Sequence, residues 1–595
     1  MGYGAQAKRA AALGGAVLTD VDIFKIALLC QAERGFSGVV QDQIYSMNDY
    51  YLKCGGFGGG DYGAYVAKSF FDELEKNLSC EMKVLSYVGV GAAQAAYSIM
   101  DGALVPVKIF DVKAGRKNVA DTSAFGNKIA IKIAQVETLS LKLTVAVSDT
   151  DTTAYLNGVD NLKVGHYIRF SEGSAEEVRV ITDIDVTTKK VTFAAISESG
   201  GFSISGCTVT RIDWKITVYV KDELGNYQKK EIWEGPFAKS DTIGLAADVN
   251  DTINGSDFII LAVNSSNASA PEDQIPAELV TETALTGGAD GAEANDAAWL
   301  ALAEAYLVDT EFTFLLAPES SSVTHNQNME AFCTDDYKGM YYAQSSNEAS
   351  QAILQDFGAN MRGGIVFAMC PGDKWIRVND PTVLGGTKDI PKVGVDAAFW
   401  FNTYYRFGES KVAAGNKPEM ILKTKAKLLD SNGLVHDDRS SVGQRMIEDY
   451  SINICKFTRG RGITNNSART FSTDGGYMYQ NQIMQFILYM RSILVYLRSI
   501  EQDRSGANAM ESHKNVVTTY MKRKWKAGHL FTGQNEDGSF TTFEDVCIII
   551  NDFTINTLAR IANGEEETFL QFVAVPPIEK PTLSLASAAA TTIGT

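Results

Sequence analysis

The densest group of charged side chains is a run of four cations within five positions, and such a run can bind an acidic partner. The four are Lys522, Arg523, Lys524 and Lys526. The surrounding pattern predicts a helix through His513–Trp525, so the run would lie on its last turn, where the helix dipole favours positive charge. Charge capping is therefore one interpretation. The other is a docking face, to which Tyr520 and Trp525 would add stacking surfaces if the partner were a nucleic acid.

The segment 452–530 is basic, whereas the rest of the chain is acidic. It holds twelve Lys or Arg and four Asp or Glu, a net charge of +8, while the whole chain carries −18. The remainder therefore carries −26. Because so acidic a remainder would repel phosphate, nucleic acid is the weaker choice of partner. An acidic protein that approaches one local face agrees with both charges.

No motif has the spacing of a nucleotide or serine-nucleophile site. The glycine run 55–60 resembles a phosphate-binding loop only in glycine content, because no Gly-Lys-Ser/Thr follows it. A Gly-x-Ser-x-Gly nucleophile motif does not occur. The five histidines are far apart in the sequence: His166, His325, His436, His513 and His529. We therefore predict no catalytic residue, no enzyme activity and no cofactor.

Candidate metal ligands are also weak. Asp149-Thr150-Asp151 begins like a calcium loop, but Ala154 stands where the turn glycine belongs. Asp290 and Asp296 could bind a cation, although a Gly/Asp turn is the commoner structure. The cysteines form no C-x-x-C pair and no zinc-site spacing: Cys30, Cys54, Cys80, Cys207, Cys333, Cys370, Cys455 and Cys547. We expect free thiols and no metal site.

The elements that must position these residues alternate between strand and helix patterns. A strand pattern at Phe24–Cys30, a helix pattern at Tyr62–Leu74 and a strand pattern at Met82–Tyr87 indicate α/β organisation. Residues 150–212 instead contain short alternating strands, which predicts an inserted all-β unit. The last third contains helix patterns and two strands, which predicts an α+β unit.

The predicted fold class is multidomain, with α/β body domains, an α+β C-terminal domain, a small inserted all-β domain and extended terminal arms. The predicted segments are an arm at 1–20, a body domain at 21–149 plus 213–285, the insert at 150–212, an α/β domain at 286–440, a C-terminal domain at 441–577 and an arm at 578–595.

The longest apolar stretch, Ile483–Ile500, predicts a buried helix, because Gln485, Arg491 and Arg498 interrupt it. An arginine near the centre of a bilayer costs about 2.5–3.5 kcal/mol on insertion scales. A membrane span is therefore not expected. The segment 1–19 is a poor signal peptide, because its apolar run is short and rich in small residues.

Five short motifs resemble the contractile tail sheath family, and they occur in that family's order. The first is Gly126-Asn127 before a strand, and the second is the turn 286–291 with Gly287, Gly288, Asp290 and Gly291. Ala317-Pro318 follows. The remaining motifs are the phrase Gly460-Arg461-Gly462-Ile463 with Ala468-Arg469-Thr470, and Gly528-His529-Leu530. Two departures are the loose match at Gly506-Ala507-Asn508 and the insert 150–212, which the smallest members lack.

The resemblance implies a structural subunit that stacks as hexameric rings around an inner tube and contracts to drive the tube through the host envelope. The arms would add strands to neighbouring copies. Lys522, Arg523, Lys524 and Lys526 would face the tube. The implied partners are further copies of the chain, the tube protein, and the baseplate and tail terminator proteins, with no membrane and no direct nucleic acid. The implied location is a virion tail assembled in the host bacterial cytoplasm.

Two alternatives remain open at this point. The chain could be the sheath of a bacteriocin-like particle or of a bacterial contractile injection system. More distantly, it could be a nucleic-acid-binding tail-completion protein, because the basic segment 452–530 could also bind phosphate.

Overall fold

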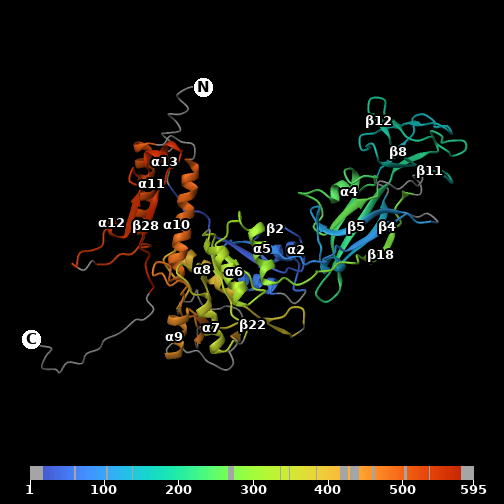
Figure 1. The fold of residues 1–595 in the computed structure, drawn as a ribbon. Helices are drawn as coiled ribbons and strands as arrows, with labels where there is room; N and C mark the ends of the chain where they lie inside the picture. Colours follow the sequence, from blue (N-terminus) through green and yellow to red (C-terminus); the bar gives the residue numbers. More distant parts are fainter. Residues whose placement is uncertain are drawn as a thin grey trace, which may run out of the picture.

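The computed structural model describes residues 18–577 with internal gaps. The residues outside the description are 1–17, 59–61, 102–104, 137–138, 265–273, 336, 348, 384, 416–426, 429–440, 459–461, 501–505, 535–536 and 578–595. Both predicted arms, 1–20 and 578–595, thus lie outside the described residues, except for residues 18–20. The described parts form an elongated molecule, with the C-terminal helices at one end and the small β unit at the other (Figure 1).

A six-stranded sheet forms the centre of the molecule, in the order β2-β3-β1-β19-β20-β21. All neighbours are parallel except β2 and β3. The strands are β1 (Lys25–Cys30), β2 (Val40–Ile44), β3 (Glu81–Ser86), β19 (Phe314–Leu316), β20 (Met340–Tyr342) and β21 (Ala368–Met369). The predicted α/β organisation is confirmed here.

Helices cover both faces of this sheet. Alternate residues of β1 point to opposite faces, and the side chains on each face belong to a different buried core. Ile26 and Leu28 belong to one buried core, and Ala27 and Leu29 to another. The first core receives residues of α2 (Met47–Cys54), α3 (Gly63–Glu73) and α8 (Val393–Phe407). The second receives residues of α5 (Asp296–Tyr306), α6 (Val323–Asp335), α7 (Gln351–Met361) and α9 (Ser441–Tyr450).

The chain from β4 to β18 forms a separate β region. One of its sheets has the order β16-β15-β7-β18 and another the order β17-β5-β4, and a third core contains residues of both. The elements are β4 (Ala96–Met100), β5 (Lys108–Arg116), β6 (Val119–Ala120), η1 (Ala124–Lys128), β7 (Ile129–Val136), β15 (Asp213–Lys221), β16 (Tyr227–Pro236), α4 (Gly244–Val249), β17 (Ile259–Val263) and β18 (Leu279–Ala284).

The inserted all-β unit lies at the far end of this region (Figure 1). Its sheets have the orders β11-β10-β14-β8 and β12-β13-β9. The strands are β8 (Ser140–Lys142), β9 (Thr153–Tyr155), β10 (Tyr167–Glu172), β11 (Ala175–Val180), β12 (Asp183–Asp185), β13 (Lys190–Thr192) and β14 (Thr208–Arg211). The predicted start at residue 150 is wrong, because β8 pairs with β14 and Leu141 and Leu143 belong to the core of the unit.

Two long helices and a two-stranded sheet form the C-terminal region. They are α10 (Gln480–Ser499), α11 (Ala507–Lys526), β27 (Cys547–Ile550) and β28 (Phe569–Phe572). The short helix α12 (Phe543–Val546) directly precedes β27, and the short helix α13 (Leu558–Ala562) lies between β27 and β28 in the sequence. Both predicted helices are confirmed, and α11 begins earlier than His513.

Two further small sheets lie before α10 in the sequence, with the orders β23-β22-β24 and β25-β26. Their strands are β22 (Ile376–Asn379), β23 (Thr387–Ile390), β24 (Lys427–Leu428), β25 (Cys455–Thr458) and β26 (Gly462–Asn465).

Two predicted domain boundaries are corrected by the strand pairing and the cores. Residues 21–86 do not belong with 213–285, because β1 pairs in parallel with β3 and β19 in the central sheet. Residues 441–471 do not belong with the C-terminal helices, because Met446, Ile452 and Phe471 lie in the second core of the central region. Both errors arise because contacts between distant segments leave no local pattern in the sequence.

Arg34 links the central region to the β region. Its Nε donates to Asp121 Oδ2 at 3.0 Å, and its Nη2 donates to the carbonyl of Asp257 at 2.8 Å. Both side chains of the Arg34–Asp121 pair are fully buried. The guanidinium also lies near the rings of Phe125 and Phe258, at 5.1 and 5.4 Å from their centroids. Removing one partner of such a buried ion pair is strongly destabilising, because the other charge is then buried without compensation.

We predict that Arg34→Met lowers the free energy of unfolding by about 3–5 kcal/mol, because it leaves the Asp121 carboxylate buried without its cation. Urea unfolding followed by tryptophan fluorescence measures the change. The control is Lys215→Met, since the Lys215–Glu234 pair is about two-fifths exposed and should contribute no more than about 1 kcal/mol. An Arg34→Met variant as stable as the control would contradict the prediction.

Candidate functional site: the C-terminal helical region

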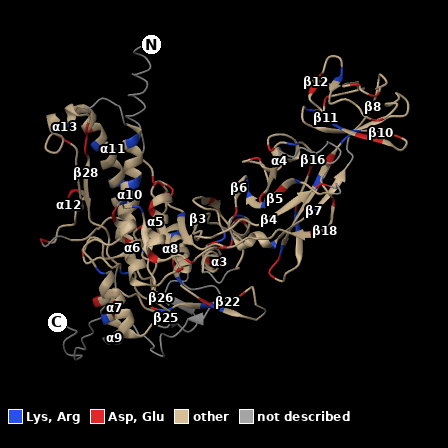
Figure 2. Ribbon diagram, turned by 45° about the vertical axis from the view of Figure 1, so that its right-hand side comes forward, with Lys and Arg blue, Asp and Glu red and all other residues tan. Residues whose placement is uncertain are grey.

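The cationic run lies on the last turn of α11, as the sequence predicts. The helix ends at Lys526, and Gly528, two residues later, has a φ of +79°, the left-handed conformation typical of a glycine after a helix. Lys522 and Lys526 are exposed. Lys522 Nζ lies 3.3 Å from Glu544 Oε1, and the exposed Arg523 donates to the carbonyl of Leu18. Lys and Arg residues lie along both α10 and α11 (Figure 2).

The prediction that all four cations share an outward face is wrong for Lys524. This side chain is buried, and its Nζ lies 2.8 Å from Glu409 Oε1 and 2.7 Å from Asp20 Oδ2. It also lies near the rings of Tyr489 and Tyr520. Lys524, unlike the other three cations, thus points inward and binds two carboxylates. No local pattern indicates this, because its partners lie 115 and 504 residues away in the sequence.

The first described residues of the chain contact α10 and α11. Tyr520 Oη donates to Asp20 Oδ1 at 2.7 Å, and the backbone N–H of Val21 donates to Ser492 Oγ at 3.1 Å. Leu18 is buried in the first core. Burial, together with the charge of Asp20, raises the pKa of Tyr520, so its hydroxyl remains a donor at neutral pH. Residues 18–21 are therefore an anchored segment of the subunit rather than a free arm.

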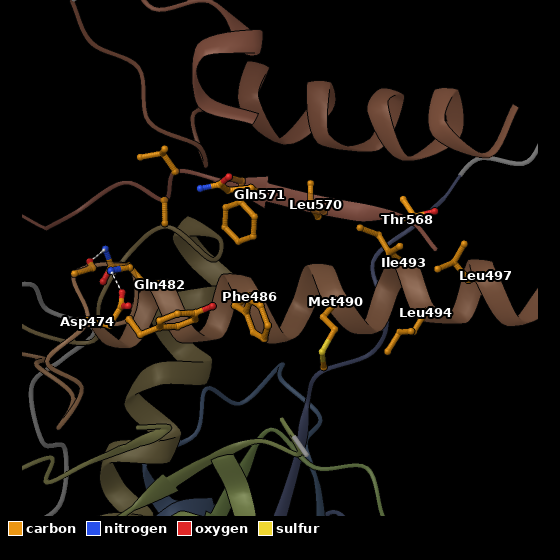
Figure 3. Close-up of a pocket in the computed structure, with 16 residues that line it drawn as sticks. Asp474, Gln482, Phe486, Met490, Ile493, Leu494, Leu497, Thr568, Leu570 and Gln571 are labelled. Carbon is orange, nitrogen blue, oxygen red and sulfur yellow. Dashed lines mark hydrogen bonds between the residues drawn. The ribbon is translucent and has the colours of Figure 1, made fainter. Parts of the chain in front are cut away.

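An apolar groove lies between α10 and β28 (Figure 3). Its cavity measures about 620 Å³, and α10 contributes Phe486, Met490, Ile493 and Leu497 to its lining. Leu570 lines the opposite wall. These four apolar residues recur at helical spacing, so the sequence predicts an apolar stripe along the helix. The sequence does not show that part of this stripe lines an open groove instead of packing in a core. β28 pairs with β27 along one edge only, so its other edge has no strand partner among the described residues.

The outer face of the β27–β28 sheet is also apolar. Ile548, Phe569 and Val573 are 47%, 42% and 47% exposed. In the paired register, Ile549 and Leu570 are directly opposite each other and point towards the helices, so their neighbours in sequence point outward. Several exposed apolar side chains on one small sheet mark an interaction surface rather than an ordinary solvated face.

The Gly126-Asn127 motif and the turn 286–291 contact each other. Asn127 Nδ2 donates to the carbonyl of Gly288 at 2.9 Å, and the N–H of Gly288 donates to Asn127 Oδ1 at 2.9 Å. Asp290 Oδ1 accepts from the N–H of Ala124 at 2.6 Å. The two motifs therefore form one structural joint where the chain passes between the central and β regions. Asp290 serves as a turn acceptor there.

Steric constraints explain why glycine occupies several positions of this joint. Gly287 and Gly291 have φ values of +86° and +77°, where other residues are strained. A Cβ at Gly288 would lie 2.5 Å from the carbonyl oxygen of Ser123. A Cβ at Gly126 would lie 2.6 Å from the Cβ of Ala95. Backbone conformation therefore accounts for Gly287 and Gly291, and close packing accounts for Gly126 and Gly288.

The Ala468-Arg469-Thr470 motif connects β26 to α10. The N–H of Arg469 donates to Asn453 Oδ1 at 2.8 Å, and Thr470 Oγ1 donates to the carbonyl of Tyr477 at 2.6 Å. Ala468 is buried in the first core. In the same phrase, Gly460 lies outside the described residues and Gly462 begins β26. The described part of the motif thus has a packing role.

Within the described residues, no group of three or more metal-ligating side chains is arranged to hold an ion. In the same part of the chain, no helix is long and apolar enough to cross a membrane. All eight cysteines are free and buried, which confirms the expectation of free thiols. Burial lowers the pKa of His166 to about 4, and positive neighbours add to this effect. That imidazole is therefore neutral at neutral pH.

Known protein-family models and curated proteins give no match to the chain. Solved structures similar to it include a sheath tail protein of Listeria innocua, with 12% identity, 95% of this chain and 98% of that chain covered, and a TM-score of 0.48. A sheath tail protein of Desulfitobacterium hafniense has 10% identity, coverages of 93% and 97%, and a TM-score of 0.42. The sheath complex of an extracellular contractile injection system has 18% identity, coverages of 51% and 78%, and a TM-score of 0.40. Similarity at this level does not assign a function, which has to be argued from the residues themselves.

We predict that Lys524→Met destabilises the anchored segment 18–21, because it leaves Glu409 and Asp20 without their shared cation. The free energy of unfolding should fall by about 3 kcal/mol, as for other broken buried pairs. Hydrogen exchange at the amide of Val21 should become faster. Lys526→Met is the control, since that exposed side chain should change neither quantity. Equal exchange in both variants would contradict the assigned role of Lys524.

Proposed function

We propose that the chain is the structural subunit of a contractile tail sheath, which assembles as stacked hexameric rings around an inner tube. The observation that carries the proposal is the set of five motifs in the order of the sheath family. Two of them, Gly126-Asn127 and the turn 286–291, meet in one joint although they are far apart in the sequence. A set of unrelated chance matches would have no reason to pack together.

The C-terminal region supplies the surface for assembly. The free edge of β28 offers backbone donors and acceptors, and the groove between β28 and α10 can hold apolar side chains beside that edge. A strand added there would gain main-chain hydrogen bonds, while the groove would select its side chains. An open strand edge beside an apolar surface favours association with another chain.

The proposed occupant of this groove is the segment 578–595 of a second copy. It contains Thr582-Leu583-Ser584-Leu585, in which polar and apolar residues alternate. Alternation of this kind places both leucines on one face of an extended strand. The leucines would enter the groove, and the hydroxyl side chains would face solvent. The segment 1–17 would link to another neighbour from the anchored residues 18–21.

The outward cations of α11 would rest on the tube in the extended sheath. Because Lys524 is buried, the proposed tube-facing set is reduced to Lys522, Arg523 and Lys526. Exposed ion pairs contribute roughly 0–1 kcal/mol each, which is weak enough to break during contraction. Contraction would be a rigid-body rearrangement of subunits that remain linked by their arms. This role requires no catalysis and no cofactor.

The proposed partners are further copies of the chain, the tube protein, and the baseplate and tail terminator proteins. The proposed setting is a virion tail assembled in the host bacterial cytoplasm, where contraction would drive the tube through the envelope for genome delivery. A bacteriocin-like particle or a bacterial contractile injection system would use the same subunit chemistry.

We predict that the purified chain forms helical tubes visible by negative-stain electron microscopy. Deletion of 578–595 should abolish the tubes but leave a folded subunit with an unchanged unfolding midpoint, because the deleted segment would pack on another copy. The matched groove variant is Leu570→Glu, which should have the same effect on tubes. A wild-type chain that remains monomeric at high concentration would refute the sheath assignment.

We also predict that Lys522→Glu, Arg523→Glu and Lys526→Glu, combined, impair assembly on the tube protein more than self-assembly. The control combines Lys221→Glu, Lys229→Glu and Lys230→Glu, three exposed cations of the β region. Co-sedimentation with tube protein at several salt concentrations measures the difference. If both triple variants behave alike, the α11 face does not contact the tube. Salt-dependent retention of the wild type on DNA would instead favour the nucleic-acid-binding alternative.

A further inference from the structure

A buried polar cluster lies between the start of α8 and the end of β26. Lys392 immediately precedes α8, Asp396 is in its first turn, and Asn465 is the last residue of β26. Their exposed fractions are 4%, 2% and 3%. Lys392 Nζ donates to Asn465 Oδ1 at 2.8 Å and also contacts Asp396 Oδ1. Asn465 Nδ2 donates to the same Asp396 oxygen at 2.6 Å.

This arrangement is more than a buried ion pair. A simple pair would need only Lys392 and Asp396, whereas here a primary amide contacts both charged groups. The second carboxylate oxygen, Asp396 Oδ2, is buried and has no hydrogen-bond partner among the described residues. Burying a charged carboxylate without full hydrogen bonding is costly. The cluster therefore brings an amine, an amide and a carboxyl group together in a buried site.

We propose that Lys392 and Asn465 form an intramolecular isopeptide bond, with Asp396 as the proton-transferring catalytic residue. The lysine nitrogen attacks the side-chain amide carbon of Asn465, so that a C–N bond forms to Lys392 Nζ. The original C–N bond of the asparagine amide breaks, and ammonia leaves. The step exchanges one amide for another, so no oxidant, reductant or further reactant is required.

Asp396 is placed to move the protons of this reaction. Its Oδ1 contacts both the nitrogen that must lose protons and the nitrogen that must gain one. Burial alone would lower the pKa of Lys392, but its charge and hydrogen-bond interactions with neighbouring side chains, above all Asp396, together raise it, so the resting amine is protonated. Burial raises the pKa of Asp396, which suits a carboxyl that takes the proton before attack and returns it to the leaving amide nitrogen.

Cys455 completes the site as a donor to the amide oxygen. Its Sγ lies 3.3 Å from Asn465 Oδ1, the atom on which negative charge develops during attack. Burial raises the pKa of this thiol to about 12, so it stays protonated at neutral pH. Lys392 and Cys455 both donate to Asn465 Oδ1, which polarises the carbonyl group towards attack. The thiol itself is a weak competitor as nucleophile, because it is not ionised.

The bond would fasten the start of α8 to the β25–β26 hairpin, across a loop of 73 residues. A covalent link of this kind lowers the entropy of the unfolded chain, as a disulfide does, but it resists reducing agents. It would hold together the part of the central region from which α10 and the C-terminal helices continue. The inference concerns chemistry within a single chain and does not depend on the proposed function.

Intact-mass spectrometry of the folded full-length chain tests the proposal. We expect the wild type to be lighter than its sequence mass by one ammonia, and proteolysis to yield a branched peptide that joins Lys392 to Asn465. Loss of one water instead would indicate a Lys392–Asp396 bond and would refute the assigned amide partner. A wild type at its full sequence mass after prolonged incubation of the folded protein would refute the proposal altogether.

Variants separate catalysis from folding. Asp396→Asn keeps the shape of the site but removes the proton acceptor, so this variant should show its full sequence mass while remaining folded by circular dichroism. Lys392→Met with Asn465→Leu should likewise retain its full mass. Cys455→Ala should still form the bond, but at least severalfold more slowly after refolding. The control Lys68→Arg, at an exposed site on α3, should still lose one ammonia. Bond formation at wild-type rate in Asp396→Asn would remove the role given to Asp396.

Discussion

The parallel pairing of β1 with β19 is the constraint on which the rest of the structure depends. Ile26 aligns with Phe314 and Leu28 with Leu316, so two segments from distant parts of the sequence are neighbours in the central sheet. The chain from β4 to β18, including both sheets of the β region and the inserted unit, is thereby an excursion from one sheet. The ends of that excursion lie side by side, since Ala93 and Ala289 form an antiparallel bridge, and Asn127 binds Gly288 close to this point.

Buried charge is the second organising feature, and in each case it joins segments that hydrophobic contacts alone would leave free to slide. Arg34 and Asp121 join the central and β regions. The buried pair Lys524–Glu409 joins α11 to the loop after α8, and the more exposed Asp20, at the start of the described chain, binds the same lysine. Such groups cost desolvation energy, which is recovered only in one arrangement of the partners. They therefore fix the relative positions of elements more than they add stability.

Local pattern was sufficient to predict α3, α10, α11, β1, β3 and the existence of an all-β insert, because these depend on periodicity within a single segment. It failed where position depends on a distant partner. The start of the insert was missed because β8 pairs with β14, which is far along the chain. The inward turn of Lys524 was missed for the same reason. The cationic run was correctly placed on a helix end, but sequence could not show which of its members faces solvent.

The distribution of rigid and open features bears on how such a subunit could take part in a large assembly. The motif glycines lie at tightly packed joints, where an added Cβ at Gly126 or Gly288 would meet other atoms at 2.6 or 2.5 Å. The open features, a free strand edge at β28 and an apolar groove beside it, gather in the C-terminal region. A subunit whose regions pack tightly where they meet transmits force with little deformation, because packed interiors have low compressibility. In the proposed sheath, movement between copies would fall on the chain segments proposed to join them, and the subunits would rearrange as rigid bodies.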